Sequence, residues 1–144
     1  MKERVPAQPK YFLAKTDPET YSIEQFEGEG RTVWDGVRNP QALRAIRDMK
    51  AGDRVYIYHS MSDAAIVGVA DVVEDGRPDP KDPKLAVADF RFRSRVEPPV
   101  TLREIKQSGL FDDWALVRQS RLSTMAAPDK FVQWIRSLRP DCRF

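Results

Sequence analysis

The chain has 144 residues, of which 41% are hydrophobic, 32% charged and 10% aromatic, a composition that excludes a disordered or fibrous chain and predicts one domain with a hydrophobic core. Its formal net charge of +2 does not by itself indicate nucleic-acid binding. The N-terminal residues lack the apolar stretch of a signal peptide or a membrane span, so we expect a cytoplasmic protein with no membrane partner.

The first elements are short. Residues 1–9 carry no periodicity and are interpreted as a flexible tail. The apolar run at 11–14 predicts a buried strand. Ser22 followed by Gln25 is typical of a capping box and predicts a helix of one or two turns that ends near Gly28.

A second helix begins with a stronger signal, because Asn39 is a good N-cap and Pro40 needs no N–H at the first helical position. Its apolar residues fall on one face, and Gly52 marks the end of the helical segment. These residues are Ala42, Leu43, Ile46 and Met49.

The middle of the chain is β-rich. Residues 54–60 and 65–73 are predicted to be strands joined by a hairpin at 61–64. The stretch 74–84 is dense in Pro, Asp and Gly and is predicted to be an exposed loop. A further strand is expected at 86–96.

The C-terminal part returns to helix. Thr101 and Glu104 form a second capping-box pattern, and a last helix is predicted from about Pro128. Short strands mixed with helices, without a βαβ rhythm, indicate an α+β fold in which a mixed sheet curls into a barrel. The domain is expected to span residues 10–140, with a tail at 141–144.

Basic residues concentrate in the last third, where residues 91–144 contain 11 Lys and Arg against 6 Asp and Glu. Alternation along the strand at 86–96 places Arg91, Arg93 and Arg95 on one face, with Phe90, Phe92 and Val96 on the other. This stripe could follow a nucleic-acid backbone. A solvated face paired with carboxylates is the alternative.

Candidate catalytic residues are few. His59 is the single histidine and is adjacent to Ser60 on a strand, where neighbouring side chains point to opposite faces. Cys142 is the single cysteine and is interpreted as a surface thiol. We therefore assign no catalytic residue, no metal site and no cofactor.

The segment 31–42 carries the most unusual combination of side chains. Trp34 offers a flat apolar face, and Arg38 and Asn39 offer paired hydrogen-bonding groups just before a helix N-terminus. The same three residues could instead be a core tryptophan, an ion-paired arginine and a helix cap.

Three segments of the chain resemble the EVE domains, members of the PUA-like superfamily. They are YFLAKTDPETYSI at 11–23, TVWDGVRNPQA at 32–42 with MKAGDRVYIYHS at 49–60, and VRQSRLS at 117–123. The resemblance implies a mixed β pseudo-barrel flanked by helices. It also implies binding of a modified base, commonly a modified cytosine, flipped into an aromatic pocket.

The resemblance also implies which residues form that pocket. They are Lys15, Thr16, Asp17, Trp34, Gly36, Val37, Arg38, Asn39, Tyr58, His59, Ser60, Gln119, Arg121, Leu122 and Ser123. We expect a non-enzymatic monomer that binds DNA or RNA carrying a modified base, with base flipping into the pocket. A small hydrolase or transferase acting on a nucleotide-like ligand in the same pocket is the alternative, and a structural partner-binding domain is a third.

Overall fold

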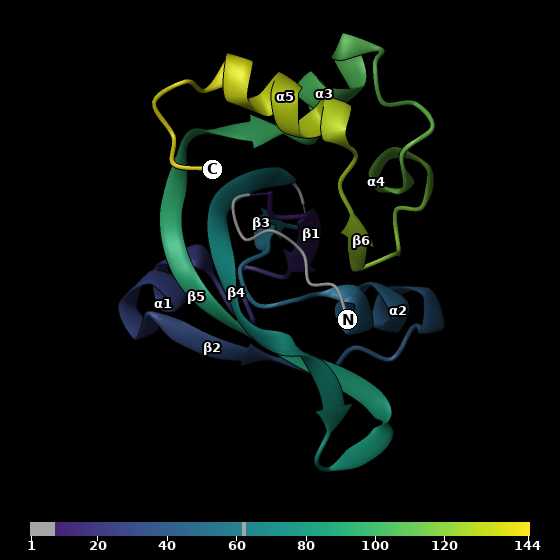
Figure 1. Ribbon diagram of the computed structural model, residues 1–144. Helices are drawn as coiled ribbons and strands as arrows, with labels where there is room; N and C mark the ends of the chain where they lie inside the picture. Colours follow the sequence, from purple (N-terminus) through teal and green to yellow (C-terminus); the bar gives the residue numbers. More distant parts are fainter. Residues whose placement is uncertain (1–7, 62) are drawn as a thin grey trace.

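The computed structural model describes residues 8–61 and 63–144, so residues 1–7 of the predicted tail lie outside the described part. The strands are β1 (Tyr11–Thr16), β2 (Arg31–Trp34), β3 (Arg54–His59), β4 (Ala65–Asp79), β5 (Asp82–Thr101) and β6 (Thr124–Ala126). They form one sheet in the order β2-β5-β4-β3-β1-β6. The helices are α1 (Ile23–Glu29), α2 (Pro40–Asp48), α3 (Leu102–Ser108), α4 (Ala115–Arg118) and α5 (Asp129–Leu138). The predicted α+β class with a single curved sheet is confirmed (Figure 1).

Both faces of the sheet are buried. β1 and β3 pair in parallel, and the other pairs are antiparallel. Side chains of β1 alternate between two cores: Leu13 packs with Phe131 of α5, and Phe12 packs with Phe26 of α1 and Ile46 of α2. We call these the α5 cluster and the α1–α2 cluster. Figure 1 shows α5 and α3 at one end of the sheet and α1 and α2 at the other.

The predicted helix starts are confirmed by their caps. The Ser22 hydroxyl accepts a hydrogen bond from the Gln25 N–H at 3.1 Å, and the Gln25 side chain accepts one from the Ser22 N–H at 2.9 Å. The Asn39 side chain accepts hydrogen bonds from the backbone N–H groups of Gln41 and Ala42 at 2.8 and 3.1 Å. These bonds satisfy N–H groups that a helix leaves unpaired at its first turn.

The prediction of an exposed loop at 74–84 is wrong. β4 continues to Asp79 and β5 begins at Asp82, so the segment forms the end of a two-stranded arm that extends beyond the sheet (Figure 1). Proline is tolerated there because it lacks only the N–H donor and its φ suits extended backbone outside the centre of a sheet. The prediction did not include the short elements β2, α4 and β6.

The predicted single face for the three strand arginines is also wrong. Ser94 pairs with Val69 and Phe92 pairs with Ala70, which leaves Arg93 as an extra residue in β5. Such a bulge changes the alternation of side chains. Accordingly, Phe90 packs in the α1–α2 cluster and Val96 in the α5 cluster.

The bulge therefore separates Arg95 from Arg91 and Arg93. Arg95 pairs with Glu27 of α1 at 2.9 Å. Arg91 and Arg93 lie on the other side of the strand and face Asp71, at 3.6 and 3.4 Å.

None of the helices in residues 8–61 and 63–144 has the length and hydropathy needed to cross a bilayer.

Candidate functional site

A cavity of about 540 Å³ opens where the end of β1 meets β2 and the loop before α2. We call it the Trp34 cavity. Its size lies within the range of ligand pockets, roughly 300–1,000 Å³. The described lining residues are Lys15, Thr16, Asp17, Thr20, Tyr21, Thr32, Val33, Trp34, Asp35, Gly36, Val37, Arg38 and Ser123.

The apolar wall of the cavity consists of packed aromatic rings. Trp34 is 9% exposed, and Phe90 stacks on its indole with centroids 5.1 Å apart. Tyr21 meets the same indole edge-on at 6.2 Å. The Tyr21 hydroxyl donates to Glu29 at 2.6 Å, and burial together with this hydrogen bond raises the Tyr21 pKa to about 12. The wall is therefore rigid and uncharged at neutral pH.

Lys15 closes one side of the cavity. Its Nζ donates a hydrogen bond to the carbonyl of Ser120 at 2.9 Å and lies 5.5 Å from the centre of the Tyr58 ring. Its backbone N–H donates to the carbonyl of Ser123 at 2.8 Å. Partial burial lowers the Lys15 pKa. Lys15 thereby holds the segment before β6 against β1.

The charged lining is balanced, with Lys15 and Arg38 opposed by Asp17 and Asp35. The Asp17 carboxylate accepts a hydrogen bond from the Glu19 N–H at 2.9 Å. Arg38 is exposed and has no side-chain partner among the described residues, so its guanidinium is available to a ligand. A balanced polar rim around an aromatic wall suits a heterocycle with several donors and acceptors better than a multiply charged anion.

The structure brings part of the predicted pocket together. Eight predicted residues line the Trp34 cavity: Lys15, Thr16, Asp17, Trp34, Gly36, Val37, Arg38 and Ser123. Seven lie outside its lining: Asn39, Tyr58, His59, Ser60, Gln119, Arg121 and Leu122.

Several residues outside the lining support it. Asn39 caps α2, and Tyr58 lies under the Lys15 ammonium. The Ser60 N–H donates to the Thr16 carbonyl at 3.0 Å, and His59 Nε2 accepts a hydrogen bond from the Ile23 N–H at 3.0 Å.

Three residues of the 117–123 segment have other positions. Gln119 is the C-cap of α4, Leu122 is buried in the α5 cluster, and Arg121 is exposed.

Sequence analysis missed five lining residues: Thr20, Tyr21, Thr32, Val33 and Asp35. Tyr21 directly precedes the Ser22 N-cap, and an aromatic residue at that position was the feature of the sequence that could have indicated a lining residue. Thr32 and Val33 of β2, and Asp35 directly after it, depend on the pairing of β2 with β5. Thr20 lies in the turn between β1 and α1, where its N–H donates to the Asp17 carbonyl at 2.9 Å.

Cys142 is half-buried and packs against the α5 cluster. Within the described ranges, no group of His, Cys, Asp and Glu side chains could hold a metal ion.

Known proteins are similar to this chain in sequence and fold. The EVE domain model matches residues 10–138. Thymocyte nuclear protein 1 from Rattus norvegicus is 27% identical, over 89% of this chain and 73% of that protein. The NMR structure of Rpa0253 from Rhodopseudomonas palustris has 30% identity and a TM-score of 0.86, covering 94% of this chain and 96% of that chain.

A structure of human THYN1 protein in complex with 5-methylcytosine-containing DNA has the same fold. It has 24% identity and a TM-score of 0.83, and it covers 93% of this chain and 99% of that chain.

Proposed function

This chain belongs to the EVE domain family, and we propose that it binds nucleic acid and accepts a modified base, such as a modified cytosine, in the Trp34 cavity. The observation that carries the proposal is an aromatic-walled cavity with a balanced polar rim, formed by the segments that the family resemblance singles out. The human THYN1 complex with 5-methylcytosine-containing DNA supports it. A flipped base needs such a site because its binding must offset a few kcal/mol of unstacking and unpairing.

Each part of the cavity has a role in this proposal. Trp34 and Tyr21 provide the aromatic surface against which the base lies. Arg38 and Asp35, on the loop before α2, offer donors and acceptors to its polar edge. Gly36 lies between them with φ +77°, a conformation that residues with a Cβ rarely adopt, so it sets the direction of both side chains.

The proposed function is binding without a chemical step. The described lining contains no histidine or cysteine. The single histidine, His59, already accepts the Ile23 N–H through Nε2. The lining groups can stack on a base and form hydrogen bonds with its edge, which is the role we propose for them.

The test is binding to a panel of duplex and single-stranded oligonucleotides that differ in one base, with cytosine, 5-methylcytosine or other modified cytosines at that position. We expect one modified base to bind more tightly than cytosine. Arg38→Ala should weaken that oligonucleotide about tenfold, the effect of losing one charge-assisted hydrogen bond. Arg44→Ala is the matched control, because Arg44 is also exposed but lies on α2 outside the cavity lining.

Trp34→Ala should reduce the preference for the modified base by roughly 5- to 150-fold, since stacking contributes about 1–3 kcal/mol per base. Trp34 is nearly buried, so Trp34→Phe, which keeps a ring against Phe90, provides a folded comparison. Equal affinity of the parent protein for every oligonucleotide in the panel would refute modified-base recognition.

A further inference from the structure

A second cavity lies at the opposite end of β1 from the Trp34 cavity. It has a volume of about 370 Å³ and is formed between β5, the end of α5 and the last residues of the chain. Four arginines line it: Arg93, Arg136, Arg139 and Arg143. We call it the arginine cavity. Unlike the Trp34 cavity, its described lining includes no aspartate or glutamate.

The arginines are held in place by neutral groups more than by acidic ones. Arg136 donates to the Tyr11 hydroxyl at 2.7 Å and lies over the Tyr11 ring, 5.5 Å from its centre. Arg139 donates to the carbonyls of Pro98 and Pro99 at 2.7 and 3.1 Å. These contacts fix the guanidinium planes without neutralising their charge.

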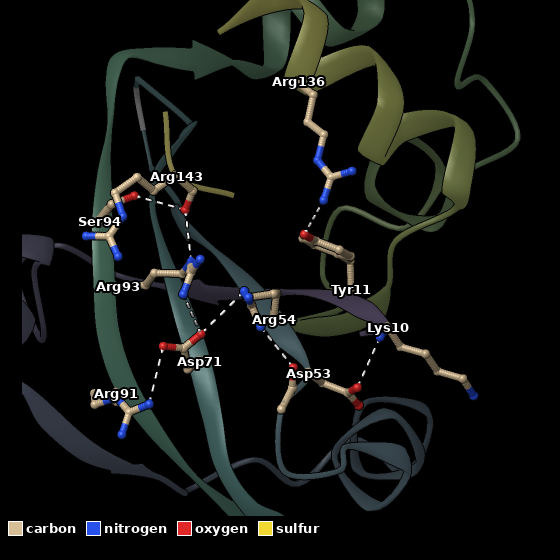
Figure 2. A network of polar contacts seen from close by, with 11 residues as sticks. Lys10, Tyr11, Asp53, Arg54, Asp71, Arg91, Arg93, Ser94, Arg136 and Arg143 are labelled. Atoms are coloured by element: carbon tan, nitrogen blue, oxygen red, sulfur yellow. Dashed lines mark hydrogen bonds and ion pairs between the residues drawn. The ribbon is translucent and has the colours of Figure 1, made fainter. Parts of the chain in front are cut away.

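Carboxylates compensate only part of the positive charge. Arg139 has Glu104 at 3.5 Å. Arg93 shares the Asp71 carboxylate with two further arginines, Arg54 at 3.3 Å and Arg91 at 3.6 Å (Figure 2). One carboxylate thus serves three guanidinium groups.

Arg136 and Arg143 have no carboxylate within 4.0 Å among the described residues. The backbone carbonyl of Arg143 accepts a hydrogen bond from Arg93 Nε at 3.1 Å, as Figure 2 shows. This contact positions the segment while leaving the Arg143 side chain without a protein partner in the described part.

A buried tyrosine packs against the cavity wall without itself lining the cavity. The Tyr56 hydroxyl is fully buried and has no hydrogen-bond partner among the described residues. The Tyr56 ring packs edge-on against Phe144, which lines the cavity, with centroids 5.9 Å apart. Tyr56 thus supports Phe144 in the cavity wall, and the groups available to a ligand are the four arginines.

We propose that the arginine cavity is a binding site for a phosphate group. Arginine presents a planar fork of donors that matches phosphate oxygens, and several converging guanidinium groups favour an anion with more than one charge. The phosphate can come from a nucleic-acid backbone or from a free phosphate-bearing small molecule. The site is separate from the Trp34 cavity, with which it shares no lining residue.

The experiment compares Arg143→Glu with Lys81→Glu. Both change the net charge equally, but Lys81 is exposed at the tip of the β4–β5 arm. Two probes separate the sources of phosphate: inorganic phosphate followed by calorimetry, and an unmodified duplex oligonucleotide followed by fluorescence anisotropy over a range of salt concentrations. Arg143→Lys, which keeps the charge, should restore binding in part.

We expect Arg143→Glu to weaken at least one probe tenfold or more, and Lys81→Glu to leave both unchanged. If the duplex is the affected probe, the slope of log affinity against log salt should flatten by about 0.9. Loss of inorganic phosphate binding alone assigns the cavity to a small ligand. If neither probe is weakened by Arg143→Glu or by the double variant with Arg136→Gln, the proposal is refuted.

The test of the arginine cavity is independent of the test of the proposed function. Variants of the arginine cavity should preserve the ratio of affinities for modified and unmodified oligonucleotides, because that ratio is set at the Trp34 cavity in our proposal. A parent protein without that preference would refute base recognition while leaving phosphate binding to be judged by the Arg143 variants.

Discussion

The single histidine connects the end of β3 to the start of α1, next to the Trp34 cavity. His59 Nε2 accepts the N–H of Ile23 at 3.0 Å, so the ring must be neutral with its proton on Nδ1. Burial is the main cause that lowers the His59 pKa below its usual value; Arg95 also lowers it, and Glu24 acts in the opposite direction. Protonation would replace the acceptor by a donor and leave the Ile23 N–H without its partner.

The sign of the resulting pH dependence follows from this lowered pKa. Above about pH 6.5, the usual histidine pKa, the folded and unfolded states both carry a neutral ring and the bond contributes fully. As the pH falls below that value, the unfolded state takes up a proton more readily than the folded state, so the free energy of unfolding decreases. A hydrogen bond of this type contributes about 0.5–1.5 kcal/mol.

The assay is urea unfolding of the parent protein and of His59→Gln at about pH 7.5 and about pH 5.5. Glutamine can offer a carbonyl acceptor that does not titrate. We expect the parent to lose about 1 kcal/mol more than the variant between the two pH values, which corresponds to roughly 3–4 °C in melting temperature. Because the chain has one histidine, no other imidazole contributes to the difference. An equal loss in both proteins would refute the reasoning.

Three further predictions concern packing and charge. Gly76→Ala should destabilise the protein by several kcal/mol, because a Cβ there would lie 2.0 Å from the Ile46 carbonyl oxygen. Gly28→Ala in α1 is the control: its Cβ would meet nothing within 4 Å, so thermal unfolding should show a stabilisation of about 0.5–1 kcal/mol. Gly36→Ala should weaken modified-base binding, because φ +77° is strained with a Cβ; unchanged binding and stability would contradict this role. Arg91→Ala should flatten the salt dependence of duplex binding by about 0.9 if it contacts phosphate, and Arg95→Ala, paired with α1, should not; equal slopes would remove Arg91 from the binding surface.

Features that depend on neighbours along the chain were predictable from the sequence. The Ser22–Gln25 capping box, the Asn39–Pro40 helix start and the hairpin between β3 and β4 all involve contacts within a few residues. The contacts that stabilise these features join residues close together in the sequence, so the residue types alone indicate the structure. The resemblance to EVE domains extended this prediction to the fold class and to the segment around Trp34.

Only the tertiary structure decided which distant segments meet. The bulge at Arg93 depends on how β5 pairs with β4, and it moved Arg95 to the α1 side while leaving Arg93 facing Asp71. The 74–84 segment is strand because residues 74–79 pair with residues 82–89 across a short turn, and it is held against the end of α2, where the Gly76 N–H donates to the Met49 carbonyl at 2.9 Å. The arginine cavity joins β5 to residues about 50 positions later, such as Arg143. Pairing register and long-range burial set these contacts, and neither is determined by the properties of any short stretch of sequence.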